Sequence, residues 1–207
     1  MDKIPLSYIL KKHTFYKSEF YVDENVLIPR TETESIIDQI LKMGDQLFDH
    51  KGRCNFIDAG CGSGCVGISV ANERSKWNVI LSDAYFSALR ITKKNLKLCR
   101  NKNVSLVCAD WLNPFRNMSF DFIFSNPPYI EKNDSRVEKS VFLHEPHAAL
   151  FSDKGGFYDI SRIIKLSSKS LCQSGILFLE NGIGQSKGVC DLLESNDFTD
   201  ISIHIDY

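Results

Sequence analysis

The sequence predicts an α/β fold in which helices cover both faces of a mostly parallel central sheet. Short apolar runs that end in turn residues alternate along the chain with stretches whose apolar residues recur at helical spacing. Continuous apolar runs are typical of strands buried on both faces, and strand–helix–strand order makes such strands parallel. A chain of 207 residues with 43% hydrophobic side chains can bury one good-sized core. We therefore expect one main domain of this kind.

The first thirty residues precede this alternation and predict a small β-hairpin. In "HTFYKSEFYV", aromatic and β-branched residues stand on either side of Lys17 and Ser18, where we expect the turn. We divide the chain accordingly into an N-terminal segment, residues 1–30, and a main domain, residues 31–207.

The main domain is expected to alternate strands, buried on both faces, with helices. The predicted strands are Cys54 to Gly60, Asn78 to Asp83, Val104 to Asp110, Phe120 to Ser125 and Gly175 to Gly182. The predicted helices are Thr31 to about Phe48, Ser63 to Asn72, Ala84 to Arg100 and Gly156 to Leu171. Basic side chains of the third helix lie off its apolar stripe, which favours a solvated face over a nucleic-acid site.

The overall charge and the cysteines weigh against several classes of protein. A net charge of −1 gives no general attraction to nucleic acid, so we expect no direct nucleic-acid partner. No apolar run approaches the roughly 20 residues that cross a bilayer, and the N-terminus lacks a signal peptide. We expect a cytoplasmic monomer without a membrane partner. The odd number of cysteines, seven, suits reduced thiols, and Cys61 and Cys65 lack a second ligand pair, so no metal is expected.

The stretch "IDAGCGSGCVG" predicts a ligand site at the end of the first strand of the sheet. Gly60, Gly62 and Gly64 allow a tight turn and close approach of a ligand, and the helix behind them offers free N–H groups. Gly62, Gly64 and Gly67 also match the dinucleotide fingerprint, with Asp83 about 20 residues further on to hold ribose hydroxyls. Taken alone, the pattern leaves open a dinucleotide, another nucleotide-like ligand, or a turn without a ligand.

Acidic residues near this loop favour a cationic or amine-bearing ligand over a nicotinamide. Asp58 stands directly before the glycines, where it would face such a ligand. Asp110 and Trp111 follow the third strand. The carboxylate can accept a hydrogen bond from an adenine amino group while the indole packs against the ring.

The stretch "FDFIFSNPPYI", Phe120 to Ile130, predicts a rigid corner at the end of a buried strand. Pro127 and Pro128 fix two φ angles and remove two backbone donors, so Asn126 is held in place. In open α/β sheets, this end of the strands presents ligand-binding groups. A plain Pro-rich turn is the alternative. The long connection that follows, Ile130 to Gly155, is expected to be a functional loop that contains His144 and His147.

Taken together, "DAGCGSG", "SDAY", "ADW" and "NPPY" resemble the class I S-adenosylmethionine-dependent methyltransferases, which have a Rossmann-like fold. The stretches "VLIPRTETE", "HEPHAALFSDKGG" and "LFLENGIGQ" narrow the likeness to the HemK/PrmC family of release factor glutamine N5-methyltransferases. The likeness runs from about Leu6 to Tyr207. It implies an enzyme that uses S-adenosylmethionine to methylate a glutamine amide in the GGQ motif of a peptide chain release factor, its protein partner.

The resemblance and the reasoning above give a set of candidate site residues. The cofactor candidates are Asp58, Gly60, Cys61, Gly62, Ser63, Gly64, Asp83, Asp110, Trp111 and Asn126. The substrate candidates are Arg30, Glu32, Asn126, Pro127, Pro128 and Tyr129. Catalysis is expected to rest on the Asn126 oxygen and the Pro127 carbonyl, which fix the amide nitrogen, and on Tyr129, which packs on the flat amide.

The sequence departs from the family pattern in three places. The likeness begins after the separate helical domain that family members usually carry, so we expect that domain to be missing. His147 stands where the family has arginine, which makes that charge lost or pH-dependent. The chain stops at "ISIHIDY", which predicts an incomplete C-terminal hairpin. An amino-methylase of a nucleic-acid base, a noncatalytic cofactor-binding remnant and a dehydrogenase remain as alternatives.

Overall fold

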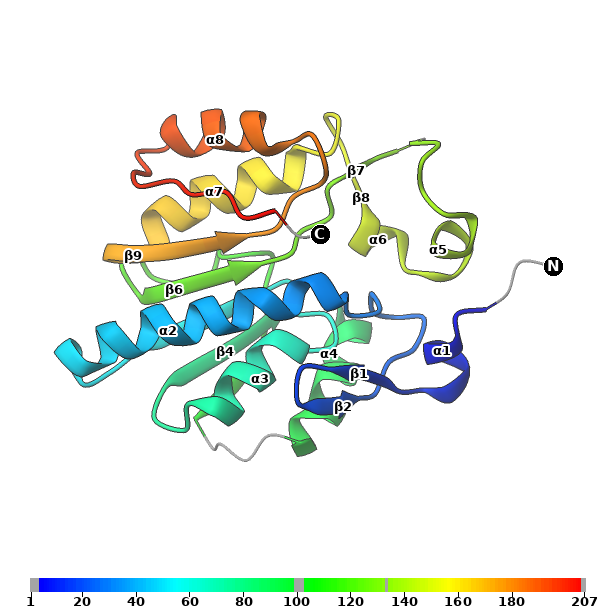
Figure 1. Ribbon diagram of the computed structural model, residues 1–207, viewed down its shortest axis with the longest axis horizontal. Helices are drawn as coiled ribbons and strands as arrows, with labels where there is room; N and C mark the ends of the chain where they lie inside the picture. Colours follow the sequence, from blue (N-terminus) through cyan, green and yellow to red (C-terminus); the bar gives the residue numbers. More distant parts are fainter. Residues whose placement is uncertain (1–3, 99–102, 133, 206–207) are drawn as a thin grey trace.

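A five-stranded parallel sheet forms the centre of the molecule, with helices on both faces (Figure 1). The computed structural model describes residues 4–98, 103–132 and 134–205. The strands lie in the order β5-β4-β3-β6-β9. They are β3 (Asn55–Ala59), β4 (Asn78–Asp83), β5 (Val104–Cys108), β6 (Phe120–Ser125) and β9 (Leu171–Leu179). This arrangement confirms the predicted α/β fold.

The central strands alternate their side chains between two apolar layers. Phe56 and Phe122 join one core cluster, whereas their neighbours Ile57 and Ile123 join a second cluster. All six residues of β6 are buried, because the strand is covered on both faces. The continuous apolar run that predicted this strand is therefore explained by the position of β6 inside the sheet, with both faces covered.

The two edge strands differ from the prediction. Most residues of β5 and β9 are only partly buried, so the expectation that every strand is buried on both faces is wrong for them. β9 begins at Leu171 rather than Gly175, directly after a helix, and its register against β6 shifts between Phe120 and Phe122. The polar residues at the start of β9 gave no strand signal.

Helices occupy the predicted stretches with shifted ends. They are η1 (Thr31–Thr33), α2 (Glu34–Lys51), α3 (Cys65–Glu73), α4 (Phe86–Asn95), η2 (Leu96–Leu98) and α7 (Tyr158–Ser170). Cys99 and the predicted end of the third helix, Arg100, lie outside the described residues. A further helix, α8 (Ser186–Glu194), was not predicted. Side chains of α2 and α3 pack into the cluster that contains Phe122, and α7 packs with α8 over the other side of the sheet.

The N-terminal segment folds onto the main core. It comprises α1 (Leu6–Leu10) and the predicted hairpin, β1 (His13–Phe15) and β2 (Ser18–Phe20). The turn falls at Tyr16 and Lys17, one residue earlier than predicted, with Tyr16 at positive φ. Phe15 and Phe20 are fully buried beside residues of α2. The hairpin therefore shares the core of the sheet.

The connection from 130 to 155, here called the excursion, contains regular structure where a loop was expected. It holds β7 (Ile130–Glu131), α5 (Lys139–His144), α6 (His147–Leu150) and β8 (Phe151–Ser152), and β7 pairs in parallel with β8. His144 and His147 thus lie in short helices. After β9, no strand occurs in residues 180–205. Among the described residues, no helix is both long and apolar enough to cross a membrane.

Candidate active site

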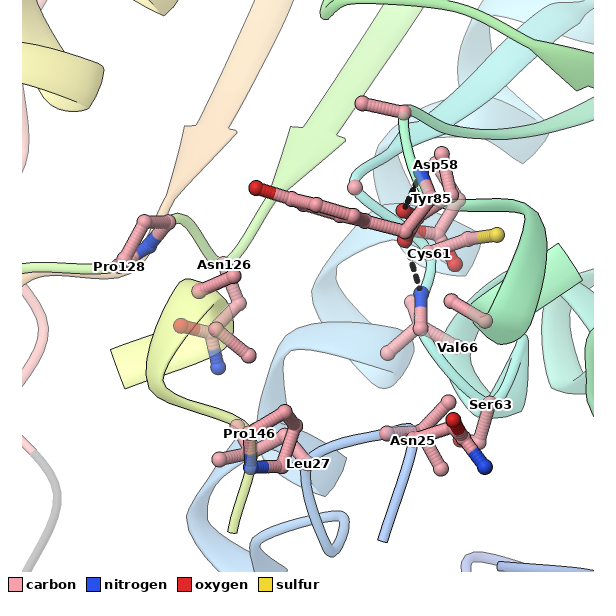
Figure 2. A pocket seen from close by; sticks show the side chains of 18 of the residues that line it. Asn25, Leu27, Asp58, Cys61, Ser63, Val66, Tyr85, Asn126, Pro128 and Pro146 are labelled. Carbon is pink, nitrogen blue, oxygen red and sulfur yellow. Dashed lines mark hydrogen bonds between the residues drawn. The ribbon is translucent and has the colours of Figure 1, made fainter. Parts of the chain in front are cut away.

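A cavity of about 330 Å³ lies at the carboxyl ends of the central strands. Its walls come from the loops after β3, β4, β5 and β6, together with residues of the N-terminal segment and of the excursion. Figure 2 shows Asp58, Cys61, Tyr85, Asn126 and Pro146 around this space. The volume falls within the range of about 300–1,000 Å³ that small-molecule sites usually have.

The glycine loop after β3 is held from behind and leaves its other side to the cavity. The N–H groups of Gly60 and Cys61 both donate to the carbonyl of Ser82, at 2.8 and 2.9 Å. Gly60 and Gly62 adopt positive φ, a region that favours glycine. These contacts hold the loop at the wall of the cavity, which Gly60, Cys61, Gly62 and Ser63 line.

Two buried polar residues of α4 fix the same loop. The Thr92 hydroxyl donates to the Gly62 carbonyl at 2.7 Å, and the Asn95 amide donates to the Ser63 carbonyl at 2.9 Å. No sequence motif indicated a role for either residue. Their signal was their polar character on the otherwise apolar stripe of the helix.

Asp83 lies at the end of β4 with each carboxylate oxygen bound to one backbone donor. Gly62 donates to Oδ2 at 3.0 Å and Tyr85 donates to Oδ1 at 2.9 Å. Burial raises the pKa of the carboxyl group. Since a carboxylate oxygen can accept more than one hydrogen bond, Asp83 retains acceptor capacity toward the cavity that it lines.

Asp58 is a buried carboxyl group at the floor of the cavity. Its Oδ2 accepts a hydrogen bond from the N–H of Gly67 at 2.9 Å. Burial, with smaller contributions from the charges of Asp83 and Glu180, raises the pKa of Asp58 to about 7, although the hydrogen bond from Gly67 acts in the opposite direction. A cationic group in the cavity would oppose this shift and stabilise the charged form.

Asp110 and Trp111 form the wall beyond β5 and are tied to α7. The indole N–H of Trp111 donates to Asp159 Oδ1 at 3.2 Å. Asp110 Oδ2 accepts from the Arg162 guanidinium at 2.5 Å, so this oxygen is already paired. Asp159 and Arg162 line the cavity as well, although no sequence motif indicated them.

The corner after β6 brings Asn126 and Pro128 to the cavity. Both residues line it, whereas Pro127 is buried outside the lining. Tyr129 was expected to pack on a substrate amide, but its ring lies against Gly182 and packs with the α7–α8 cluster. The Tyr129 carbonyl accepts from Gln185 Nε2 at 3.0 Å. Tyr129 is thus an anchor of the corner.

A buried ion pair joins the N-terminal segment to the excursion. Arg30 Nη2 lies 2.8 Å from Glu145 Oε1, and the N–H of Ile28 donates to Glu145 Oε2 at 3.1 Å. The Glu145 side chain is only 2% exposed, whereas Arg30 is 36% exposed and lines the cavity. His147 Nε2 lies 2.8 Å from the Phe142 carbonyl and does not line the cavity.

Known proteins resemble this chain over most of its length. A family model, the methyltransferase small domain, matches residues 38–179. The release factor glutamine methyltransferase of Francisella tularensis is 33% identical over 96% of this chain and 69% of its own length. That of Buchnera aphidicola from Baizongia pistaciae is 34% identical over all of this chain and 73% of its own length. The chain belongs to the release factor glutamine methyltransferase family.

Solved methyltransferases share the fold of this family member at low sequence identity. A ribosomal protein L11 methylase from Lactobacillus delbrueckii superimposes with a TM-score of 0.57 and 16% identity, over 83% of this chain and 74% of its own. A precorrin-6y C5,15-methyltransferase from Geobacter metallireducens gives 0.57 and 16%, over 87% of this chain and 78% of its own. These likenesses concern the fold alone.

Most of the residues that sequence analysis selected meet at one cavity of this methyltransferase-family chain. Those that line it are Arg30, Asp58, Gly60, Cys61, Gly62, Ser63, Asp83, Asp110, Trp111, Asn126 and Pro128. Those outside the lining are Glu32, Gly64, Pro127 and Tyr129. Tyr85 was missed as a lining residue although it belongs to the quoted "SDAY" stretch. Within the described ranges, no cluster of three His, Cys, Asp or Glu residues could hold a metal.

Proposed function

We propose that this chain transfers a methyl group from S-adenosylmethionine to the side-chain amide nitrogen of a glutamine in the GGQ motif of a peptide chain release factor. Its family membership supports this activity. The observation that carries the proposal is that Asn126 lines the same cavity as Gly60, Gly62 and Asp83. The loop to which we assign the cofactor and the corner to which we assign the amide thus border one space.

The charges around the cavity fit S-adenosylmethionine, which carries a sulfonium and an ammonium group. The two arginines that line the cavity are each paired with a carboxylate, Arg30 with Glu145 and Arg162 with Asp110. Asp58 and Asp83 also line it, and within the described part of the chain their hydrogen-bond partners are backbone donors. The surplus of carboxyl groups complements a ligand of net positive charge.

The residues present assign each end of the cofactor a place. Asp83 would accept hydrogen bonds from the ribose hydroxyls, and Trp111 would pack beside the adenine. The glycine loop and Asp58 would hold the methionine end. When bound, S-adenosylmethionine supplies an electrophilic methyl group on its sulfonium sulfur.

The corner after β6 would promote methylation of the substrate glutamine by fixing the position of its amide nitrogen. An amide lone pair is delocalised into its carbonyl, so the nitrogen is a weak nucleophile. We assign one amide N–H to the Asn126 side-chain oxygen and the other to the Pro127 carbonyl, which lies between the lining residues Asn126 and Pro128. Both acceptors would orient the nitrogen and stabilise the positive charge that develops on it as the N–C bond forms and the bond between sulfur and the methyl carbon breaks, with S-adenosylhomocysteine as the leaving group. One amide proton then leaves to water.

Mass spectrometry of a release factor incubated with the protein and S-adenosylmethionine tests this proposal. The expected product carries one added methyl group on the GGQ glutamine. Asn126→Ala should lower kcat at least about 100-fold while it changes the Kd of S-adenosylhomocysteine less than about 3-fold, because it removes an acceptor of the amide and leaves the glycine loop, Asp83 and Trp111 in place. Asn196→Ala makes the same substitution beyond α8, where the side-chain amide donates to the Leu192 carbonyl outside the cavity lining, and should leave both constants unchanged.

Two outcomes contradict the proposal. Normal methylation by the Asn126 variant would show that the corner does not position the amide. Methyl transfer to a nucleic-acid base but not to the release factor would show that a different planar nitrogen is the acceptor.

A further inference from the structure

Trp111 adopts a backbone conformation that bulky residues rarely use. Its φ of +52° lies in the left-handed region, where a side chain meets the backbone unfavourably. Such strain persists only where surrounding contacts hold the residue in place. Trp111 lines the cavity, so the contacts that hold it also determine the shape of the ligand site.

The indole ring of Trp111 lies against the glycine loop. A Cβ atom built on Gly60 would stand 2.7 Å from the Trp111 ring, which is closer than real Cβ contacts allow. The absence of a side chain at Gly60 thus lets the ring approach the loop backbone. Both residues line the cavity, so the place of the ring sets the shape of the wall between the ends of β3 and β5.

Asp159 holds the other edge of this ring. Its Oδ1 accepts the indole N–H at 3.2 Å, and its Oδ2 accepts the hydroxyl of Ser152 at 2.7 Å. The Ser152 oxygen in turn accepts the backbone N–H of Asp159 at 3.1 Å. Ser152 is 2% exposed and ends β8, the last strand of the excursion. Both carboxylate oxygens of Asp159 are therefore bound to donors of the protein itself.

We propose that Asp159 is a positioning residue, which, together with Ser152, fixes Trp111 against the glycine loop and so preforms the adenine end of the cofactor site. The proposal rests on the proposed use of S-adenosylmethionine. It also links the two halves of the site, because Ser152 belongs to the excursion while Trp111 belongs to the cofactor side. Asp159 acts through the indole and forms no bond to the reacting atoms.

Fluorine NMR of protein labelled with 5-fluorotryptophan tests this proposal directly. The chain has two tryptophans, and Trp77 is buried in the core, where it stacks on Phe122. Trp77→Phe therefore assigns the Trp111 signal. In the ligand-free protein, Asp159→Leu should shift and broaden that signal, because the indole loses its acceptor. Asp159→Asn retains an oxygen for the indole N–H and should restore most of the wild-type signal.

Binding and kinetics give the second measurement. Asp159→Leu should weaken S-adenosylhomocysteine about tenfold and raise the KM for the cofactor equally, since a hydrogen bond to a charged group is lost. The kcat at saturating cofactor and the KM for the release factor should stay within about twofold, a split that general misfolding would not give. Ser152→Ala should weaken the cofactor less than Asp159→Leu does. It provides the test if the leucine variant fails to fold.

Asp153→Leu is the matched control on the same segment. Asp153 is exposed and pairs with Lys132 at the surface, so its loss should move neither the NMR signal nor the cofactor KM. An unchanged Trp111 signal and unchanged cofactor affinity in folded Asp159→Leu would overturn the proposal. Failure of the wild-type protein to bind S-adenosylhomocysteine would instead overturn the proposed function, while the ligand-free NMR comparison would still show whether Asp159 holds the indole.

Discussion

The two walls of the cavity are held in different ways. On the cofactor wall, formed by the loops after β3, β4 and β5, the glycine loop bonds to the end of the neighbouring strand through Ser82 and Asp83. The substrate wall, formed by the corner after β6 and the excursion, depends on partners far along the chain, namely Gln185 for Tyr129 and Arg30 for Glu145. A wall held by several hydrogen bonds to the neighbouring strand should tolerate single substitutions better than a wall held by single contacts with distant segments.

The largest effect is expected from Gly156→Ala on the substrate wall. A Cβ atom at Gly156 would stand 2.0 Å from the Tyr129 carbonyl oxygen and 2.7 Å from Gln185 Nε2. The corner that carries Asn126 must then move, and a displacement of about 1 Å of a positioning group can cost about 100-fold in rate. We expect kcat to fall about 100-fold, with S-adenosylhomocysteine bound within about 3-fold of normal, as measured by methylation kinetics and calorimetry.

Gly155→Ala separates this contact from backbone strain. Gly155 has φ +66° and Gly156 has φ +86°, so alanine is strained at both positions. Apart from its chain neighbours, no described residue has an atom within 4 Å of a Cβ built on Gly155. An equal loss of kcat in the two variants would attribute the effect to backbone strain. It would contradict the prediction that contact with the Tyr129 carbonyl displaces the corner.

The separation of contacting residues along the chain decides how far the sequence predicted the site on both walls. The glycine loop and Asp83 are local motifs at strand ends, so their residues could be selected before the structure was known. Trp111 and Asp159 are 48 residues apart, and Tyr129 and Gln185 are 56 apart. No spacing rule joins residues at such separations. Their pairing follows from how α7 and the loop before α8 pack on the sheet.

The helices and strands also show which features the sequence could predict and which it could not. The bounds of β4 and β6 match the predicted ones, because most residues of β4 and all residues of β6 are buried and gave apolar runs in the sequence. Tyr129 lies outside the lining of the cavity, because side-chain direction after a Pro-rich corner is set by tertiary packing. The short helices α5 and α6 were missed because Pro146 separates them and neither is long enough for a periodic signal.

A second test of the substrate wall is Arg30→Met. Glu145 would keep the Ile28 N–H but lose its cationic partner while buried. Breaking a buried pair costs roughly 3–5 kcal/mol, and the partial exposure of Arg30 reduces our expectation to about 2 kcal/mol of unfolding free energy. Urea unfolding measures it.

Lys132→Met is the control for this variant. Lys132 and Asp153 also form an ion pair, with both side chains well exposed. Its loss should cost less than about 0.5 kcal/mol. If Lys132→Met and Arg30→Met lower the free energy of unfolding by similar amounts, the Arg30–Glu145 pair stabilises the substrate wall no more than a surface ion pair does.

The smallest expected effect concerns the cofactor wall, where Asp58 makes cofactor affinity depend on pH. Burial raises the pKa of Asp58 to about 7, and Asp83 and Glu180 act in the same direction. Between about pH 4 and pH 7, the Asp58 carboxyl group is therefore protonated in the folded protein and ionised in the unfolded chain. This contribution to stability is complete below about pH 4 and disappears as the pH rises through about 7.

A cationic cofactor reverses that preference, because it stabilises the ionised carboxylate. Binding should release up to one proton, and the Kd of S-adenosylmethionine should improve about tenfold between pH 6 and pH 8, following the ionised fraction of a group with pKa near 7. Calorimetric titration in two buffers of different ionisation enthalpy measures both quantities. Asp58→Asn retains an acceptor for the Gly67 N–H but cannot ionise, so its Kd should vary little over this range. An equal pH dependence in the asparagine variant would place the titrating group elsewhere on the wall, with Asp83 as the next buried carboxyl group to test.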